Sequence, residues 1–206
     1  MGIAKEGIAK IFILLVAALL FALSSLKIIA SFLFLIALFL IYFYRDLQRI
    51  PDREKGVVSP ADGIILEVED VFDGDFFAET CKKISIFMRI YDVHVNRMPL
   101  SGRIIKITNR GEKLYPANDR RASELNKSRT YFIELEDGKK MVLRQIAGII
   151  ARQIVSYVKE HNFVRRGERI GIVQFGSRVE LYIDRNLKTF VSVGDKVFAG
   201  KTILGE

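Results

Sequence analysis

The sequence predicts a mainly β (α+β) protein: a barrel-sandwich-like β domain with few helices, preceded by an N-terminal hydrophobic helical hairpin. The first 44 of the 206 residues account for most of the positive mean hydropathy of +0.21. The rest of the chain is divided into short runs rich in β-branched and aromatic residues, separated by Gly, Pro and Asp. With 15 Gly, 4 Pro and a half-hydrophobic composition, the chain is neither disordered nor collagen-like.

The N-terminal region is predicted to be a hairpin because two uncharged, mostly apolar stretches, 11–26 and 28–44, flank Lys27. At about 1.5 Å of rise per residue, each helix would be roughly 25 Å long, slightly shorter than a hydrocarbon core of about 30 Å. We therefore expect residues 1–50 to be a membrane-anchoring hairpin and linker that spans the bilayer or enters one leaflet. A signal peptide is one alternative. Two buried core helices are another, although apolar residues cover every face of both stretches.

Charge outside the hairpin predicts its orientation. Basic residues precede it at Lys5 and Lys10 and follow it between Arg45 and Lys55, whereas its turn carries Lys27 alone. We therefore expect a cell-membrane protein with both ends, and hence the β domain, on the cytoplasmic side. The chain after residue 44 carries +6 of the total formal charge of +8, which suits an anionic lipid surface. No helix-turn-helix or aromatic-basic platform indicates a nucleic-acid partner.

Residues 51–206 are predicted to form the β domain. Strands are expected in segments 56–70, with a turn at 60–63, and in 84–88, 102–108, 130–135 and 141–144. Two more are expected around Gly176 and Ser177, and a hairpin-like pair in 191–206. Residues 146–159 alone have a helical pattern, although many are β-branched. Segment 109–129 is polar and basic, which predicts a mobile loop that is either a solvated connection or a lid over a site.

The sequence contains few candidate catalytic or metal-binding residues. Cys81 is the only cysteine, so the chain forms no intramolecular disulfide, and no Cys/His cluster has the spacing of a metal site. Asp62 in SPADG is most simply a turn residue. His94 in YDVHVNRMP could equally be a satisfied core or surface residue. Ser177 follows a glycine between two strand-like runs, which by itself is weak evidence for a nucleophile.

Taken together, these stretches resemble the phosphatidylserine decarboxylases, in particular their short, membrane-anchored branch. The motifs SPADG, DVHVNR, R-G-E-R-x-G and F-G-S occur in this order along the chain. The resemblance covers nearly the whole chain after the hairpin. It implies a proenzyme whose domain 51–206 cleaves the chain between Gly176 and Ser177, into fragments 1–176 and 177–206. Ser177 would then become a covalent pyruvoyl group, the pyruvate-derived cofactor.

The resemblance also implies roles for single residues. Ser177 would attack the carbonyl of Gly176, His94 would act as the base, and Asp62 would orient the imidazole. The mature enzyme would decarboxylate phosphatidylserine, or archaeal archaetidylserine, to the ethanolamine phospholipid through a Schiff base, with His94 as the candidate acid. Its expected partners are the serine phospholipid, the membrane and its own two fragments; a second copy of the chain is left open.

One residue departs from the family pattern. Many longer members carry a second histidine where this chain has Arg97, so His94 serves both reaction steps, or Arg97, Asp62 or water takes over one of them. Arg97, Asn96 and Arg144 are the candidate substrate ligands, although the arginines could also belong to a generally basic surface.

The alternative interpretation is a membrane-anchored, non-catalytic β domain similar to biotinyl or lipoyl carriers. Such carriers need a lysine at an exposed hairpin tip. Lys196 in VGDKVFAG is the nearest candidate, but it lacks the usual flanking residues and resembles an ordinary turn residue.

Overall fold

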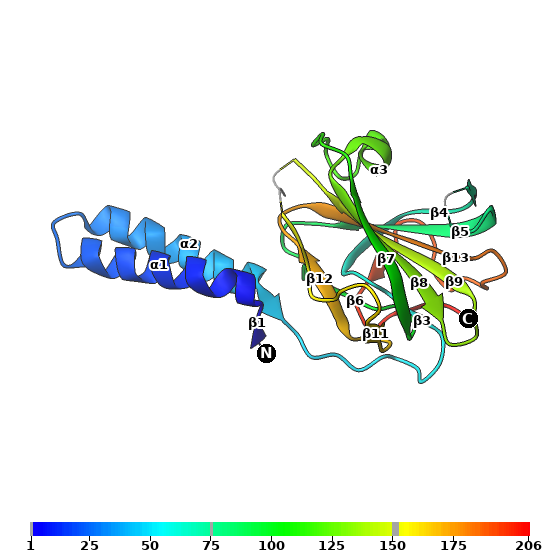
Figure 1. Ribbon diagram of the computed structural model, residues 1–206. Helices are drawn as coiled ribbons and strands as arrows, with labels where there is room; N and C mark the ends of the chain where they lie inside the picture. The colour runs from blue at the N-terminus through cyan, green and yellow to red at the C-terminus, as the bar shows by residue number, and fades with distance from the viewer. Residues whose placement is uncertain (1, 75, 150–152) are drawn as a thin grey trace. The chain divides into compact units, whose positions relative to one another are not determined.

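The computed structural model describes residues 2–74, 76–149 and 153–206, and the chain divides into two compact units, Met1–Gln48 and Arg49–Glu206 (Figure 1). The first unit is a helical hairpin of α1 (Lys5–Ala22) and α2 (Lys27–Phe43), whose ends are joined by the short strands β1 (Gly2–Ile3) and β2 (Arg45–Asp46).

Small residues occupy most of the buried positions of this hairpin. Gly7, Ala18, Ala30 and Ala37 are all buried, which allows two helices to approach closely. Large apolar side chains point outward, as Phe12 does with 67% of its surface exposed. In the part of the chain that the structure describes, no helix has both the length and the hydropathy of a candidate membrane span.

The second unit confirms the mainly β prediction. An eight-stranded antiparallel sheet curls around the core, and a three-stranded sheet packs with it. In spatial order, the large sheet contains β11 (Phe163–Val164), β7 (Gly102–Arg110), β8 (Ser128–Leu135), β9 (Lys140–Ala147), β13 (Ser177–Asp184), β5 (Glu79–Met88), β4 (Gly63–Asp73) and β14 (Lys196–Val197). The small sheet contains β10 (Ile154–Ser156), β12 (Arg169–Val173) and β6 (Val95–Arg97).

Strand β13 separates two chemically different faces. Its alternate residues Val179, Leu181 and Ile183 lie in the main hydrophobic core, together with Val173 of the small sheet. The residues between them point to the opposite face, because successive side chains of a strand alternate. By the same alternation, Ser177 belongs to the core face.

Three connections join the two sheets at one end of β13. They are 89–94 between β5 and β6, 148–153 between β9 and β10, and 174–176 between β12 and β13. The order β9-β13-β5 in the large sheet matches the order β10-β12-β6 in the small one. Residues 174–176 therefore lie between residues 89–94 on one side and the described ends of the connection 148–153 on the other.

Two local predictions are wrong. The helix expected in 146–159 is absent from the described residues of this segment, because β9 runs to Ala147 and β10 covers Ile154–Ser156; residues 150–152 lie outside the described residues. The C-terminal strands β14 and β15 (Ile203–Gly205) do not pair with each other: β14 pairs with β4, and β15 pairs with β3 (Val57–Val58). Within segment 109–129, residues 111–127 connect β7 and β8 and contain a short helix, α3 (Arg121–Leu125), while the ends of the segment belong to the two strands.

Candidate active site

Ser177 is the first residue of β13 and lies between two neighbouring strands. Its register partners are Met88 at the end of β5 and Ala147 at the end of β9. The side chain is fully buried, and its Oγ has no hydrogen-bond partner among the described residues. Nearly all buried polar groups form hydrogen bonds, so a buried hydroxyl without a partner needs an explanation. Among the described residues, His94 Nε2 and Thr108 Oγ1 are buried and unsatisfied in the same way.

The backbone before Ser177 is strained. Phe175 and Gly176 both have left-handed conformations, with φ of +52° and +61°. Glycine adopts this region freely, but a residue with a side chain pays about 1–2 kcal/mol. The Gly176–Ser177 peptide therefore lies where the chain turns sharply from the small sheet into the large one, and its carbonyl belongs to a residue without a side chain.

Gly148 packs directly against this peptide. A Cβ atom placed on Gly148 would lie 2.2 Å from the carbonyl oxygen of Gly176 and 3.2 Å from Cβ of Ala117. Ala117 belongs to the connection between β7 and β8, which thus reaches the Gly176–Ser177 peptide. The connection is held there by the buried Asn126, whose Nδ2 donates to the carbonyl oxygens of Tyr115 at 2.8 Å and of Ala147 at 2.7 Å.

His94 is fully buried in the neighbouring connection. Its Nδ1 lies 2.9 Å from the carbonyl oxygen of Asp92. A carbonyl can only accept, so Nδ1 carries the proton and Nε2 is the basic nitrogen. The carbonyl oxygen of His94 also accepts a long hydrogen bond, 3.4 Å, from the amide of Val173, just before the cleavage region. The topology thus brings His94 and Ser177 to adjacent connections.

The turn that orients His94 is rigid. The amide of Asp92 donates to the carbonyl oxygen of Arg89 at 2.9 Å, and the Asp92 carboxylate accepts from Arg89 Nε at 2.9 Å and Nη2 at 3.1 Å. These bonds raise the pKa of Arg89 above its usual value. They hold the Asp92 carbonyl in place for the imidazole.

Asp62 lies just before β4, at the same end of the sheet. Its carboxylate forms an ion pair with the Arg49 guanidinium and accepts a hydrogen bond from the amide of Ala199 at 2.8 Å. The following Gly63 packs against the backbone of β5, since a Cβ atom there would lie 2.1 Å from the carbonyl oxygen of Phe87. The role of Asp62 as the partner of His94 stays a prediction.

The three candidate substrate ligands have different surroundings. Asn96 is buried and joins the two sheets, accepting from Gln145 Nε2 at 2.7 Å. Arg97 is nearly buried and donates from Nη1 to the carbonyl oxygen of Gly167 at 2.7 Å. Arg144 pairs with Glu180 across the sheet, and therefore lies on the face opposite to Ser177. Their roles in substrate binding stay predictions.

A buried charged cluster covers that opposite face. Arg178 is 1% exposed; its Nε donates to Ser85 Oγ at 2.7 Å and lies 3.0 Å from Glu180 Oε1, while its Nη2 pairs with Glu67 at 2.5 Å. Burial raises the pKa of Glu67, but the hydrogen bond from Lys83 and the charge of Arg178 outweigh it, so the net shift is downward. The cluster anchors β13 immediately after the proposed cleavage point.

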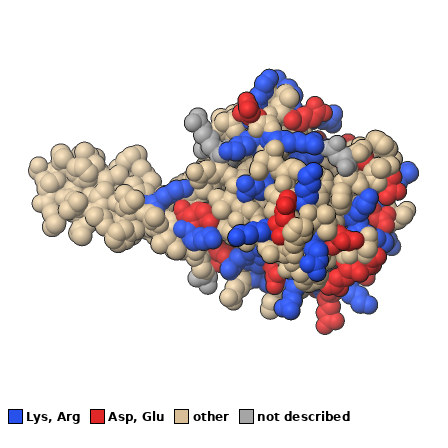
Figure 2. Space-filling model, in the orientation of Figure 1, with Lys and Arg blue, Asp and Glu red and all other residues tan. Residues whose placement is uncertain are grey.

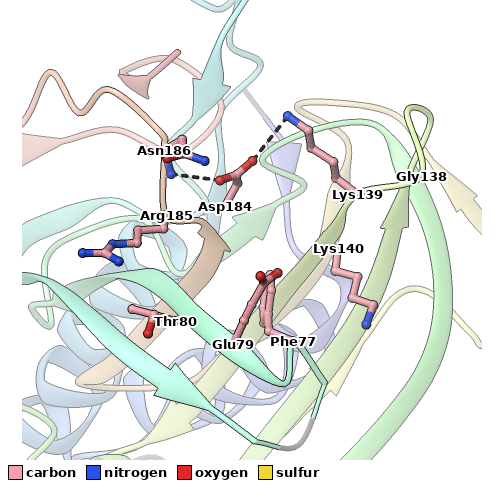
Figure 3. A pocket seen from close by; sticks show the side chains of 9 residues that line it. All are labelled: Phe77, Glu79, Thr80, Gly138, Lys139, Lys140, Asp184, Arg185 and Asn186. Atoms are coloured by element: carbon pink, nitrogen blue, oxygen red, sulfur yellow. Dashed lines mark hydrogen bonds and ion pairs between the residues drawn. The ribbon is translucent and has the colours of Figure 1, made fainter.

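A wide cavity of about 580 Å³ lies at the other end of β13 (Figure 3). Charged side chains line much of it, and Lys139 Nζ is 3.4 Å from Asp184 Oδ2. The Asp184 carboxylate also accepts from the amide of Asn186 at 2.9 Å; this bond and Lys139 lower the pKa of Asp184. We assign the chemistry to the Ser177 end, because the strained peptide and the buried histidine lie there.

Comparisons with known proteins define the class of this protein as a decarboxylase. The family model described as phosphatidylserine decarboxylase matches residues 36–205. The chain is 43% identical over 169 residues to the phosphatidylserine decarboxylase proenzyme of Syntrophus aciditrophicus, covering 82% of this chain and 79% of the relative. It is 40% identical over 206 residues to that of Desulfotalea psychrophila, covering 99% and 96%. The chain belongs to the phosphatidylserine decarboxylase family, as the motifs predicted.

Sequence reasoning missed three residues of this site. Asp92 stands two positions before His94 within the recognised motif, so its place beside a candidate base was a usable signal. Gly148 and Phe175 offered no such signal, because close backbone approach and a left-handed φ depend on how the sheets meet.

Proposed function

We propose that this protein is a self-processing, pyruvoyl-dependent decarboxylase that converts phosphatidylserine or archaetidylserine to the corresponding ethanolamine phospholipid. The single observation that carries this proposal is the Gly176–Ser177 peptide, which combines a left-handed backbone with a buried hydroxyl that has no hydrogen-bond partner among the described residues. A serine hydroxyl that is desolvated and unbonded suits a nucleophile. The same position would carry the pyruvoyl group, so the residues present fit that cofactor.

Self-processing would begin with attack by Ser177 Oγ on the carbonyl carbon of Gly176. His94 Nε2 accepts the hydroxyl proton and delivers it to the amide nitrogen of Ser177 as the C–N bond breaks, which replaces the peptide bond by an ester. The left-handed turn at Phe175 and Gly176 favours this step, because cleavage releases backbone strain.

The ester then breaks by elimination. Loss of the Cα proton of residue 177 expels the Gly176 carboxylate from Cβ, and the remaining enamine takes up water and releases ammonia. A ketone is left at the start of fragment 177–206, while fragment 1–176 ends in the carboxylate. When present, the pyruvoyl group supplies an electron-withdrawing carbonyl for the decarboxylation of the serine head group.

His94 has a second proposed task in the mature enzyme. Decarboxylation leaves a carbanion at the head-group Cα, which needs a proton. With Nδ1 held by the Asp92 carbonyl, Nε2 is the atom that can deliver it. Only one other histidine, His161, is present in the chain, and it is exposed. We propose that His94 serves both steps, in place of Arg97, Asp62 or water.

We also propose that the helical hairpin anchors the enzyme to the cell membrane, with the β domain on the cytoplasmic side. The outward-facing apolar side chains of both helices support this, as Ile28 does with 87% exposure. Anchoring keeps the enzyme at the surface that holds its lipid substrate, which raises the effective concentration of that substrate. A protease-accessibility assay on sealed vesicles tests the orientation.

Electrophoresis and mass spectrometry of the purified protein test the self-processing. We expect fragments 1–176 and 177–206, and a pyruvoyl mass at the start of the smaller one. Ser177→Ala should stay intact and inactive, whereas Ser192→Ala, an exposed serine of the same fragment, should process normally. An uncleaved but active wild type, or an ordinary serine at the start of the small fragment, contradicts the proposal. Parallel assays with diacyl and diether serine lipids distinguish the two substrates.

A further inference from the structure

We propose that exposed apolar side chains on either side of the cleavage site form a second membrane contact, which holds the Ser177 end of the sheet against an anionic bilayer. Three exposed apolar side chains, Ile90, Tyr91 and Ile149, make this contact, and we call them the apolar tips. The inference rests on the proposed function, because a lipid substrate that stays in its bilayer must reach Ser177.

The first two tips occupy an unusual place for apolar residues. The amide of Asp92 donates to the carbonyl oxygen of Arg89, so Ile90 and Tyr91 are the two corner residues of a tight turn. Gly, Pro, Asn, Asp and Ser normally fill such corners, because they provide the backbone angles or the local hydrogen bonds that a turn needs. Large apolar residues provide neither. Here Ile90 is 42% and Tyr91 50% exposed. The Arg89–Asp92 ion pair stabilises the turn, and the Arg89 guanidinium also lies 4.6 Å from the centre of the Tyr91 ring.

Ile149 lies on the opposite side of the cleavage site. Strand β9 ends at Ala147, the register partner of Ser177, and Ile149 follows two residues later with 55% exposure. Strand β5 ends at Met88, the other partner, and leads directly into the turn with Ile90. The apolar tips therefore lie on both sides of residues 174–176, at the ends of the two strands next to β13. A bilayer would have to contact this end of the sheet for its lipid to reach Ser177.

Charge distinguishes this end of the sheet from the other. Residues 109–127, which connect β7 and β8 at the Ser177 end, include five basic and three acidic residues. Residues 69–80, at the far end of β4 and β5, include five acidic residues and no basic one. On the side of the domain where the C terminus lies in Figure 1, Figure 2 shows acidic and basic side chains interspersed. An anionic surface therefore favours the Ser177 end.

Phe72 offers a matched control at the far end. It is 73% exposed, more than any apolar tip, and it lies in β4 opposite Thr80, beside the acidic connection. Exposure of a large apolar side chain alone therefore does not predict membrane contact. Contact at the apolar tips but not at Phe72 is the specific expectation.

Tryptophan fluorescence tests this directly, because the chain has no tryptophan of its own. Tyr91→Trp and Phe72→Trp are each made in the full-length Ser177→Ala chain, and vesicles of phosphatidylcholine and phosphatidylglycerol with brominated acyl chains are added. We expect a blue shift and quenching at position 91 only. Equal quenching at both positions, or no change at position 91, overturns the proposal. So does a blue shift that depends on protein concentration without vesicles, which indicates a second copy of the chain as the partner.

Activity on vesicles provides the second test. The double variant Ile90→Asp, Ile149→Asp should process itself but lose about tenfold in decarboxylation of vesicle-bound lipid, whereas Phe72→Asp should match the wild type. A double variant that processes itself and is as active as the wild type overturns the proposal. If the wild type forms no ethanolamine lipid, the proposed function fails, while quenching at position 91 in the Ser177→Ala chain still establishes the membrane contact.

Discussion

The two ends of β13 differ in burial, strain and charge, although only six residues lie between Ser177 and Asp184. At the Ser177 end the backbone is left-handed and the hydroxyl is fully buried, with Gly148 packed against the preceding carbonyl. At the Asp184 end the carboxylate is ion-paired and borders a wide, charged cavity. In this fold the proposed chemistry therefore coincides with strain and burial, and not with the wide cavity.

The largest expected effect is that of removing the candidate base. His94→Ala should slow self-cleavage by at least about 100-fold, because a positioned base contributes that much to proton transfer. The fragment ratio over time, measured by electrophoresis, is the readout. His161→Ala removes the only other histidine and should process at the wild-type rate. Self-cleavage of His94→Ala at the wild-type rate would show that His94 is not the base in this step.

The next effect distinguishes two glycines at opposite ends of the sheet. Gly148→Ala should slow cleavage by about tenfold or more, because its Cβ would displace the carbonyl oxygen of Gly176 from its position. Gly138→Ala is the control: its φ is +79°, but no atom lies within 4 Å of the added Cβ. It should cost about 1 kcal/mol of stability without slowing cleavage. Similar cleavage rates in both variants would show that close packing at position 148 does not matter.

A third comparison concerns two arginines. Arg178→Met should lower the free energy of unfolding by about 3–5 kcal/mol, because it leaves the buried Glu180 without its closest cation. Arg185, at the far end, is 61% exposed and pairs with Asp70 at 3.0 Å. Arg185→Met should cost no more than about 1 kcal/mol. Denaturant unfolding of uncleaved Ser177→Ala protein measures both, and equal losses would contradict the distinction.

The smallest effect is a pH dependence of stability. The folded-state pKa of Glu67 lies below its usual value of 4.5, so its ion pairs stabilise the folded state above that pH and are lost as the pH falls through the folded-state pKa. Melting temperatures from pH 6 down to pH 3 should therefore fall less steeply in Glu67→Gln than in the wild type. Asp184→Asn should change the slope less, because Asp184 is more exposed. A melting temperature that falls more steeply with decreasing pH in Glu67→Gln than in the wild type would contradict a lowered folded-state pKa of Glu67.

Local sequence patterns predicted most strands of the β domain but failed where pairing is non-local. The sequence predicts a helix in 146–159, yet the β-branched residues Ile154 and Val155 pair with Val173 and Ile172 of β12, 19 and 17 residues later in the chain. The last two strands were read as a hairpin, yet Val197 pairs with Gly63 and Ile203 with Val58. A two-residue period indicates a strand but does not specify its partner.

The sequence by itself determined the family, the apolar hairpin segment and the Gly176–Ser177 pair, because motifs and composition are properties of neighbouring residues. Only the tertiary structure decided that three connections between two sheets meet at Ser177, that the Asp92 carbonyl orients His94, and that Phe175 is left-handed. These features arise when the two sheets bury a common core, and strain at one peptide persists because the whole core supports it.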